Sequence, residues 1–457
     1  TVNGTDYHAT VGANGSWSAA VPAADVAKWP AGQLTIAVSG ADASGNPVTI
    51  TQNITVDLSS VAIGVDTIAS DDIINAAEKA ADLTLSGTTL NVEAGRDVTV
   101  NFAGHQYTTR VQADGSWSVT VPAADMAALK EGDATVSVSV SNAAGNGATA
   151  ANTAQVDTAA PTLTINTIAG DNVLNGAEAN ADVAIGGTST AEAGQQVTLT
   201  LNGQTYTASV AADGTWSTAV PAADAAGLTD GTYTVSASVS DIAGNRTGAS
   251  ASLQVDVTAP TLAINTVSAD DIINVHEHQQ NLIISGSSTG VPAGGLVTVV
   301  IGGSSYTAAV DASGNWSLGV PAAVVSGLAD GSHTITATVA DAAGNPGSAS
   351  HVVTVDTAAP VLTISTVAAD DVINAMEKGE ALTVSGTSSG ADGSTVTLNL
   401  NGKDYSASVS GGAWTLNVPA ADVAQLGEAN YSLTASTVDA AGNTGSTTHG
   451  VLVDSAL

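Results

Sequence analysis

A spacing of about one hundred residues recurs along the whole chain and constrains its fold more than any other feature. Five tryptophans follow this spacing, and a tyrosine upstream of each and a Gly-Asn pair downstream of each keep the same phase. Self-similarity at a fixed period indicates a tandem array, so we divide the chain into the repeats 1–57, 58–157, 158–256, 257–356 and 357–457. The five tryptophans are Trp17, Trp117, Trp216, Trp316 and Trp414.

The third repeat shows the expected elements most clearly. Apolar and polar residues alternate over short segments separated by Gly, Asn and Asp, which is typical of strands and hairpins. The segment 221–228 begins with a proline and predicts one or two helical turns, and 169–182 is expected to be a loop. The expected strands are 161–168, 183–188, 196–201, 205–210, 215–220, 232–240 and 249–255.

Seven short antiparallel strands per hundred residues predict the fold class. We expect an all-β tandem array of seven-stranded immunoglobulin-like β-sandwiches that forms an extended rod. Trp216 and its equivalents are then expected to fill the core between the two sheets. The alternative is that these tryptophans stack against a ligand, in which case they would be exposed on one face.

Charge and composition exclude several classes of function. Acidic residues outnumber basic ones by 42 to 8, which gives a formal net charge of -34. Such a surface repels nucleic acid and anionic lipid, and no apolar run is long enough to span a bilayer, so we expect neither a nucleic-acid partner nor membrane insertion. Hydrophobic residues make up 44% of the chain, too many for a disordered polyanion. Cysteine is absent, so the cores, with help from metal ions, must hold the domains.

An eight-residue acidic motif occurs once in each of the last four repeats. It reads Asp, Asp or Asn, two apolar residues, Asn, two variable residues and Glu, at 71–78, 171–178, 270–277 and 370–377. Seven alternating strands place this motif at the pole where the chain leaves a repeat. The linker, at 255–260 for example, is short and stiffened by proline. We therefore expect the motif, the Asp of the linker and the next repeat's Asp-x-Ala-Gly-Asn turn to meet.

Several carboxylates in one small region predict a cation site. Two unit charges about 5 Å apart repel by roughly 3 kcal/mol at an effective dielectric of about 20, and a divalent cation reverses that term. Donors that are all oxygens favour Ca²⁺ over Zn²⁺. The candidate ligands are Asp71, Asp72, Glu78, Asp157 and Asp241 at the second junction, Asp171, Asn172, Glu178, Asp256 and Asp341 at the third, Asp270, Asp271, Glu277, Asp356 and Asp439 at the fourth, and Asp370, Asp371, Glu377 and Asp454 after the last repeat.

A second interpretation of these residues is purely local. Asn175 and Glu178 have the spacing of a capping box, and Asp241 and Asn245 are ordinary turn formers. The two interpretations are compatible, because a helical turn can also direct a glutamate at a metal ion. The first junction departs from the pattern, since its turn begins with Asn142 and its linker, Asp57-Leu58-Ser59-Ser60, lacks the proline. We expect it to bind a cation weakly or to bend.

Other chemically suggestive motifs have simpler explanations. His276-Glu277-His278 occurs in one repeat only, which favours surface variation over a metal site. No Ser-His-Asp order recurs, and we predict no enzymatic activity. A Pro-Ala-Ala-Asp motif recurs at Asp25, Asp125, Asp224 and Asp422, with Val324 in its place in the fourth repeat. We interpret these carboxylates as charges at a helix start, with a second cation site as the alternative.

Several motifs in fixed order resemble a known family. They are Val-Asp-Thr-Ala-Ala-Pro, Asp-Asn-Val-Leu-Asn-Gly-Ala-Glu, Asp-Gly-Thr-Trp-Ser, Val-Pro-Ala-Ala-Asp and Asp-Ile-Ala-Gly-Asn. Together they resemble the bacterial Ig-like repeats of giant adhesins that Gram-negative bacteria secrete through type I systems, including biofilm-associated adhesins. The resemblance covers nearly the whole chain and implies a secreted or cell-surface location. It also implies a stalk with Ca²⁺ at the domain junctions, on the loop, linker and turn residues named above.

These observations predict a mechanical function. We expect a stalk that supports adhesion and biofilm formation, is stiffened by Ca²⁺ between neighbouring repeats, and presents a distal region that binds a host or matrix receptor. The chain opens in mid-repeat at Thr1, so we expect the receptor-binding region and any targeting signal to lie outside it. The alternatives are a carbohydrate- or receptor-binding module, which requires exposed aromatic residues, and homophilic association between rods.

Overall fold

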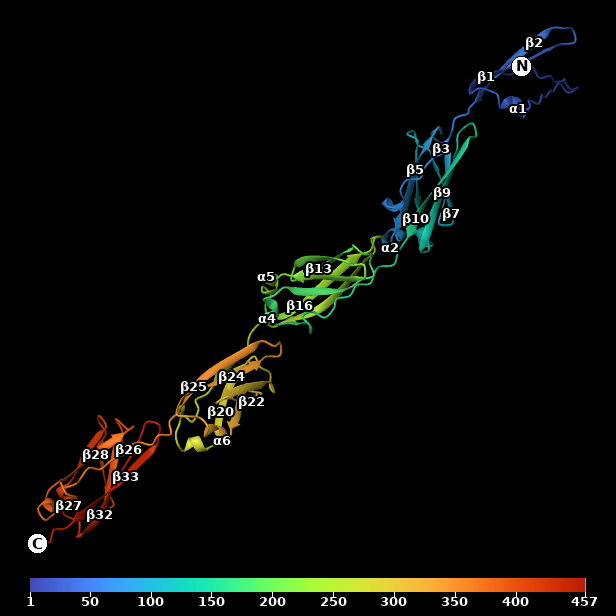
Figure 1. The fold of residues 1–457 in the computed structure, drawn as a ribbon. Coiled ribbons are helices and arrows are strands. Elements are labelled where there is room, and N and C mark those ends of the chain that lie inside the picture. Colours follow the sequence, from blue (N-terminus) through green and yellow to red (C-terminus); the bar gives the residue numbers. More distant parts are fainter. Residues whose placement is uncertain (457) are drawn as a thin grey trace. The chain divides into compact units, whose positions relative to one another are not determined.

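The computed structural model describes residues 1–456. The chain folds into compact units whose boundary passes through the third repeat. The first unit comprises Thr1–Asn166, Ile185–Thr218 and Thr234–Ala251, and the second comprises Thr167–Ala184, Ala219–Tyr233 and the chain from Ser252 onward. Strands dominate both units, and each helix is a single turn (Figure 1).

The second repeat, in the first unit, shows the complete sandwich. Its smaller sheet has the order β3-β5-β8, and its larger sheet has the order β4-β10-β9-β6-β7. The inward-facing residues of the two sheets form one core around Trp117. Its elements are β3 (Ala62–Ile63), η1 (Ile68–Ser70), β4 (Ile73–Ile74), α2 (Ala76–Lys79), β5 (Leu83–Leu90), β6 (Asp97–Phe102), β7 (His105–Arg110), β8 (Ser116–Val121), α3 (Ala123–Met126), β9 (Gly132–Ser141) and β10 (Gly147–Val156).

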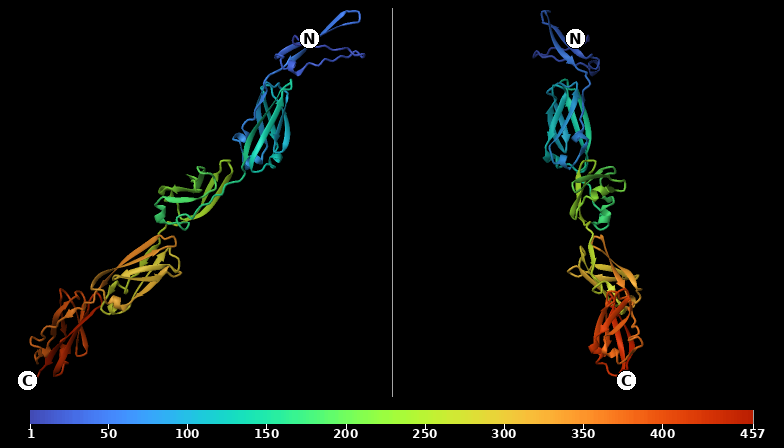
Figure 2. Two further views of the ribbon diagram at one scale, coloured as in Figure 1. Left: turned by 45° about the vertical axis from the view of Figure 1, so that its right-hand side comes forward. Right: turned by 90° about the vertical axis from the view of Figure 1, so that its left-hand side faces the viewer.

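The fourth and fifth repeats, in the second unit, repeat this topology (Figure 2). The fourth contains β18 (Thr261–Ile264), β19 (Ile272–Ile273), η2 (Glu277–Gln279), β20 (Leu282–Thr289), β21 (Leu296–Ile301), β22 (Ser304–Ala309), β23 (Asn315–Val320), α6 (Ala322–Val325), β24 (Gly331–Ala340) and β25 (Pro346–Val355). The fifth contains β26 (Val361–Leu362), β27 (Val372–Ile373), η3 (Glu377–Gly379), β28 (Leu382–Ser389), β29 (Thr395–Leu400), β30 (Lys403–Ser408), β31 (Ala413–Val418), α7 (Ala420–Val423), β32 (Ala429–Val438) and β33 (Thr444–Val453).

The remaining two repeats carry the same elements in part. The first has a hairpin of two long strands and one helical turn, α1 (Ala23–Val26), β1 (Gly32–Ala41) and β2 (Pro47–Val56). The third contains β11 (Val173–Leu174), α4 (Gly176–Ala179), β12 (Val183–Thr188), β13 (Gln196–Leu201), β14 (Gln204–Ser209), β15 (Thr215–Val220), α5 (Ala222–Ala225), β16 (Gly231–Ser240) and β17 (Arg246–Val255). The prediction of an all-β tandem array is confirmed, and the repeat boundaries stay predictions.

Two expectations about the third repeat are wrong. The segment 161–168 does not form a regular strand. It makes one isolated bridge, between Leu163 and Ser189, and its backbone hydrogen bonds run to the segment 186–190. The segment 169–182 is not a plain loop, because Val173 and Leu174 pair in parallel with the end of β17. The physical reason for this pairing is burial, since Leu174 has only 1% of its surface exposed. The sandwich is therefore not purely antiparallel.

The four tryptophans of the later repeats lie in the core, as predicted. Trp316 has 2% of its surface exposed and lies under Gly286 of the neighbouring strand. A Cβ atom on Gly286 would lie 1.9 Å from the Ala263 carbonyl oxygen and 2.4 Å from Trp316 Cζ2. Only glycine lets β18 approach β20 this closely above the indole ring. Trp17, in the first repeat, is 47% exposed.

Candidate junction site

The acidic motif first builds a capped helical turn. In the third repeat, Asn175 Oδ1 accepts hydrogen bonds from the backbone N–H of Ala177 and Glu178, both at 3.0 Å. In return, Glu178 Oε2 accepts from the Asn175 N–H at 3.0 Å. The motifs of the other three repeats make the same reciprocal contacts. The capping-box prediction is confirmed, and it occupies one oxygen of each motif glutamate.

The first two residues of the motif also have local roles. The second residue has a positive φ, 65° at Asn172 and 63° at Asp271, which Asn and Asp tolerate better than most residues. Asn172 Oδ1 accepts from the Ile168 N–H at 2.9 Å and so closes the preceding bend. Asp171 Oδ1 accepts from the Val173 N–H at 2.9 Å. These contacts give the Asp-Asp/Asn pair a local structural role, and its assignment as metal ligands stays a prediction.

A buried asparagine joins the acidic motif, the linker and the next repeat's turn. At the third junction, Asn345 Oδ1 accepts from the Gly176 N–H at 2.7 Å. The Asn345 amide donates to the Asp256 carbonyl oxygen and to Asp341 Oδ2, both at 2.9 Å. Asn345 has 3% of its surface exposed. One side chain thus connects all three elements that the sequence predicts to meet.

Equivalent asparagines make the same contacts at two other junctions. Asn245 accepts from the Ala76 N–H at 2.9 Å and donates to the Asp157 carbonyl oxygen at 2.9 Å. Asn443 accepts from the Val275 N–H at 2.8 Å and donates to the Asp356 carbonyl oxygen at 2.9 Å. These asparagines were not predicted as junction residues. The available sequence signal was that an asparagine follows a glycine in every repeat, and we attributed this recurrence to turn formation.

The candidate carboxylates are held mainly by nearby backbone N–H groups. Asp341 Oδ1 accepts from Ala343 at 2.9 Å and from Asn345 at 2.8 Å. The linker carboxylates of Asp157 and Asp356 each accept from the N–H two residues later. Among residues 1–456, no three His, Asp or Glu side chains gather closely enough to hold a metal ion. The assignment of these residues as metal ligands therefore stays a prediction.

A further acidic residue, missed in the sequence, holds the start of each complete linker. Asp230 accepts from the Val257 N–H at 2.7 Å and from the Thr258 hydroxyl at 2.5 Å. These hydrogen bonds, that of Thr258 first, lower the pKa of Asp230. Glu131, Asp330 and Glu428 make equivalent contacts with Thr158, Thr357 and Ser455. Each of these acids comes directly before a strand, so we call them the strand-start acids. They are Glu131, Asp230, Asp330 and Glu428.

The first junction uses a different set of groups. Asn146 donates to the Asp57 carbonyl oxygen at 3.0 Å, as the other turn asparagines do to their linkers. Asn142, in place of the turn's aspartate, donates from Nδ2 to Asp57 Oδ2 at 2.8 Å. Ala31 stands where the strand-start acid would be. An amide therefore stands where the later turns carry a carboxylate, and it bonds to the linker carboxylate.

Two further motifs, one that recurs and one that occurs once, have structural partners. In the Pro-Ala-Ala-Asp motif, Asp125 accepts a hydrogen bond from the Tyr107 hydroxyl at 2.7 Å, and Asp422 accepts from Tyr405 at 3.0 Å. Burial, followed by the contact with Asp125, raises the pKa of Tyr107 to about 12. The two histidines of the 276–278 motif bond to different groups, Gln280 and the Leu328 carbonyl oxygen.

Comparison with known proteins identifies related sequences over most of the chain. A model described as "Bacterial Ig-like domain" matches residues 161–258 and 266–357, and one described as "Bacterial Ig-like domain (group 3)" matches 324–452. A solved Ca²⁺-stabilized adhesin that helps an Antarctic bacterium reach out and bind ice is 37% identical over 87% of this chain and 99% of that chain, with a TM-score of 0.39. No curated protein matches the chain.

Two further solved structures are similar in sequence. One belongs to a 1.5-MDa bacterial ice-binding adhesin and is 34% identical over 66% of this chain and all of that chain (100%), with a TM-score of 0.37. The other is a tetra-tandem repeat in the extending region of a large adhesion protein. It is 29% identical over 87% of this chain and 99% of that chain, with a TM-score of 0.37. None of the helices in the described residues has the length and hydrophobicity needed to cross a membrane.

Proposed function

Because the chain belongs to the family of bacterial Ig-like domains that recur in large adhesins, we propose that it is a stalk region of a bacterial surface adhesin. Ig-like repeats of adhesins are structural rather than enzymatic. The observation that carries the proposal is the buried asparagine at each complete junction, which bonds the motif of one repeat, the linker and the turn of the next. Such a contact resists bending between repeats and lets a chain of domains hold a distal binding region away from the cell.

Calcium is the second part of the proposal. A related adhesin is described as Ca²⁺-stabilized, and the motif, linker and turn that Asn345 joins all carry oxygen donors suited to Ca²⁺. At the third junction we propose Glu178, Asp256 and Asp341 as the ligands, which requires these carboxylates to come together from the separate positions that they hold in this structure. The ion supplies positive charge that offsets repulsion among these carboxylates. The residues of this chain orient the donors, because Asn345 fixes Asp341 and the Asp256 backbone.

Chelation of the full-length chain tests the calcium proposal. We expect excess Ca²⁺ to raise the melting temperature, since a site filled at about one hundred times its Kd stabilises by about 2.7 kcal/mol. Isothermal titration of Asp256→Asn should show fewer bound ions than the native chain. Asp213→Asn, which removes a hairpin carboxylate of the same repeat, is the matched control. The proposal would be refuted if the titration showed no heat of Ca²⁺ binding and chelator left the small-angle scattering profile unchanged.

The other functions considered from the sequence are less well supported. A carbohydrate- or receptor-binding module requires exposed recurrent aromatics, but Trp117, Trp216, Trp316 and Trp414 have at most 3% of their surface exposed. We therefore place receptor binding in a distal region of the protein and propose a secreted or cell-surface location. Support of biofilm formation and secretion by a type I system follow from the resemblance alone. Homophilic association is tested by sedimentation across a Ca²⁺ series.

A further inference from the structure

The second repeat carries an arginine where the other complete repeats carry an uncharged residue. Arg96 precedes β6, and its backbone carbonyl accepts from the Val111 N–H. The same backbone contact is made by Gln195, Gly295 and Ser394 in the later repeats, which establishes their equivalence. Among the four positions, only Arg96 supplies a positive charge.

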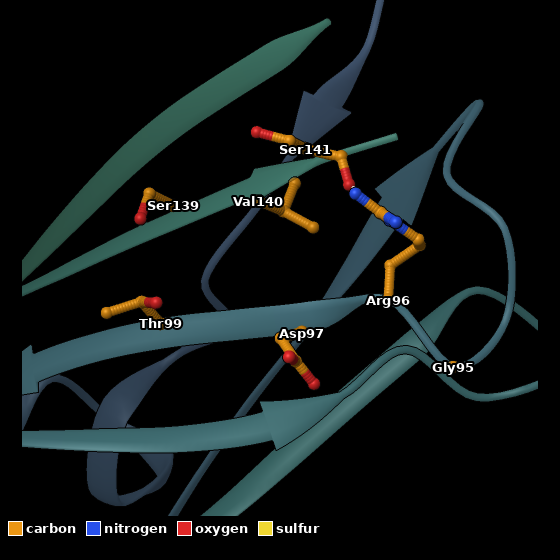
Figure 3. Close-up of a pocket in the computed structure, with 7 residues that line it drawn as sticks. All are labelled: Gly95, Arg96, Asp97, Thr99, Ser139, Val140 and Ser141. Carbon is orange, nitrogen blue, oxygen red and sulfur yellow. The ribbon is translucent and has the colours of Figure 1, made fainter. Parts of the chain in front are cut away.

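The side chain of Arg96 reaches the turn that faces the first linker. Its Nε donates to the Ser141 carbonyl oxygen at 2.8 Å, and its Nη2 donates to the Asn142 carbonyl oxygen at 2.9 Å. Figure 3 shows the guanidinium extending from the edge of a shallow polar hollow toward Ser141. Because a guanidinium stays protonated in proteins, this is a permanent cation at the start of the turn.

The contacts continue from the turn to the linker. Asn142, with 1% of its surface exposed, donates to Asp57 Oδ2 at 2.8 Å. Compared with the third repeat, the second has Asn142 in place of Asp241 and Arg96 in place of Gln195. Each replacement makes the turn more positive by one charge. The turn carboxylate that Asp241 supplies in the third repeat is absent here. Arg96 lies beside the turn together with Glu93, which accepts from the Ala143 N–H at 2.9 Å.

We infer that Arg96 is a positioning residue that takes the place of a divalent cation at the first junction. Through Asn142 it holds Asp57, so this junction keeps its geometry without Ca²⁺, whereas the later junctions depend on the ion. The inference rests on the proposed calcium function for that contrast. Of the two expectations for the first junction, it favours weak cation binding over bending, because hydrogen bonds from Asn142 and Asn146 hold Asp57.

Spin-label distances in the full chain test the inference, since the native sequence has no cysteine. One labelled pair, T51C with T84C, spans the first junction, and the equivalent exposed pair, S250C with I283C, spans the third. Each distance distribution is measured by double electron–electron resonance in excess Ca²⁺ and in chelator. We expect chelation to leave the first distribution narrow and to broaden the third.

Substitution of the arginine separates its role from that of calcium. Arg96→Gln, which introduces the residue found in the third repeat, should broaden the first distribution in both conditions and leave the third unchanged. Arg110→Gln, which removes an exposed arginine paired with Asp97 at 3.3 Å, is the control and should change neither. An unaltered first distribution in Arg96→Gln, or broadening of the first junction by chelator, would overturn the inference. If chelator leaves the third distance distribution unchanged, the calcium proposal is overturned instead. The effect of Arg96→Gln in chelator then still tests the role of Arg96.

Discussion

The first and third junctions share one contact and differ in charge. In both, an asparagine at the end of the turn donates to the carbonyl oxygen of the linker aspartate, at 3.0 Å from Asn146 and at 2.9 Å from Asn345. At the third junction the turn begins with Asp341, whereas at the first it begins with Asn142 and lies beside Arg96. The shared amide bonds the turn to the linker at both junctions, and we propose that the charges around it determine whether a cation is needed.

This difference separates two properties that a tandem array can vary independently. A buried amide satisfies backbone groups on both sides of a junction, and its loss leaves them without partners whatever the ionic conditions. Carboxylates add repulsion that an ion must offset. If the calcium proposal holds, ion-dependent and ion-independent junctions can lie in series in one chain while both keep the asparagine.

The largest effect is expected from a change that removes a sandwich rather than a junction. Gly286→Ala would place a Cβ atom 1.9 Å from a backbone oxygen, and we expect the fourth repeat to lose about 3 kcal/mol or more. Hydrogen exchange should show deprotection throughout β18 and β20 while the first junction stays protected. Gly319→Ala, where the nearest atom is 3.9 Å away, is the control. Equal loss in both variants would argue against the steric explanation.

The next largest effect is expected at the shared asparagine. Asn345→Ala leaves the Gly176 N–H and the Asp256 carbonyl oxygen without this partner, at a cost of about 2 kcal/mol. Exchange of the Gly176 amide should accelerate both with Ca²⁺ and with chelator. Asn146→Ala should loosen the first junction in the same way, and Ser305→Ala, at an exposed position, should have no effect. If Ca²⁺ restored protection in Asn345→Ala, the amide would not set the geometry as argued.

Much of the sandwich could be predicted because its signals are local. The strands Val183–Thr188, Gln196–Leu201 and Thr215–Val220 have the predicted bounds, since each alternates and is bounded by turn residues. Val173-Leu174 was missed because two residues carry no period, and their pairing with β17 depends on burial. The role of Asn345 was missed because a Gly-Asn pair forms a turn equally well when its amide bonds only within that turn. The sequence predicted that the motif, the linker and the turn meet, but which side chain joins them depends on the tertiary arrangement.

A smaller effect is expected from the strand-start acids, which the first repeat lacks. Asp230→Asn weakens the contacts with Val257 and Thr258, so the linker should become more accessible to proteases than in the native chain, though less so than in Asn345→Ala. Limited proteolysis at the 256–260 linker measures this. Asp311→Asn, at a hairpin of the next repeat, is the control. Equal cleavage of Asp230→Asn and the native chain would mean that Asn345 alone holds the linker.

The smallest effect concerns whether the Pro-Ala-Ala-Asp carboxylates belong to the sandwich or to a cation site. Burial and Asp125 raise the pKa of Tyr107 to about 12, above the ordinary value of about 10. The protonated phenol therefore favours the folded state, and this contribution is full below about pH 10 and is lost as pH rises through about 12. Tyrosinate absorbance should lose a step near pH 12 in Tyr107→Phe. Chelator should leave that step in place, because Asp125 accepts a hydrogen bond from the phenol and we interpret it as part of the sandwich rather than as an ion ligand. If the pH of this titration step shifts on addition of Ca²⁺, Asp125 would instead belong to a second cation site. The stability of the sandwich would then depend on the ion, as proposed for the third junction.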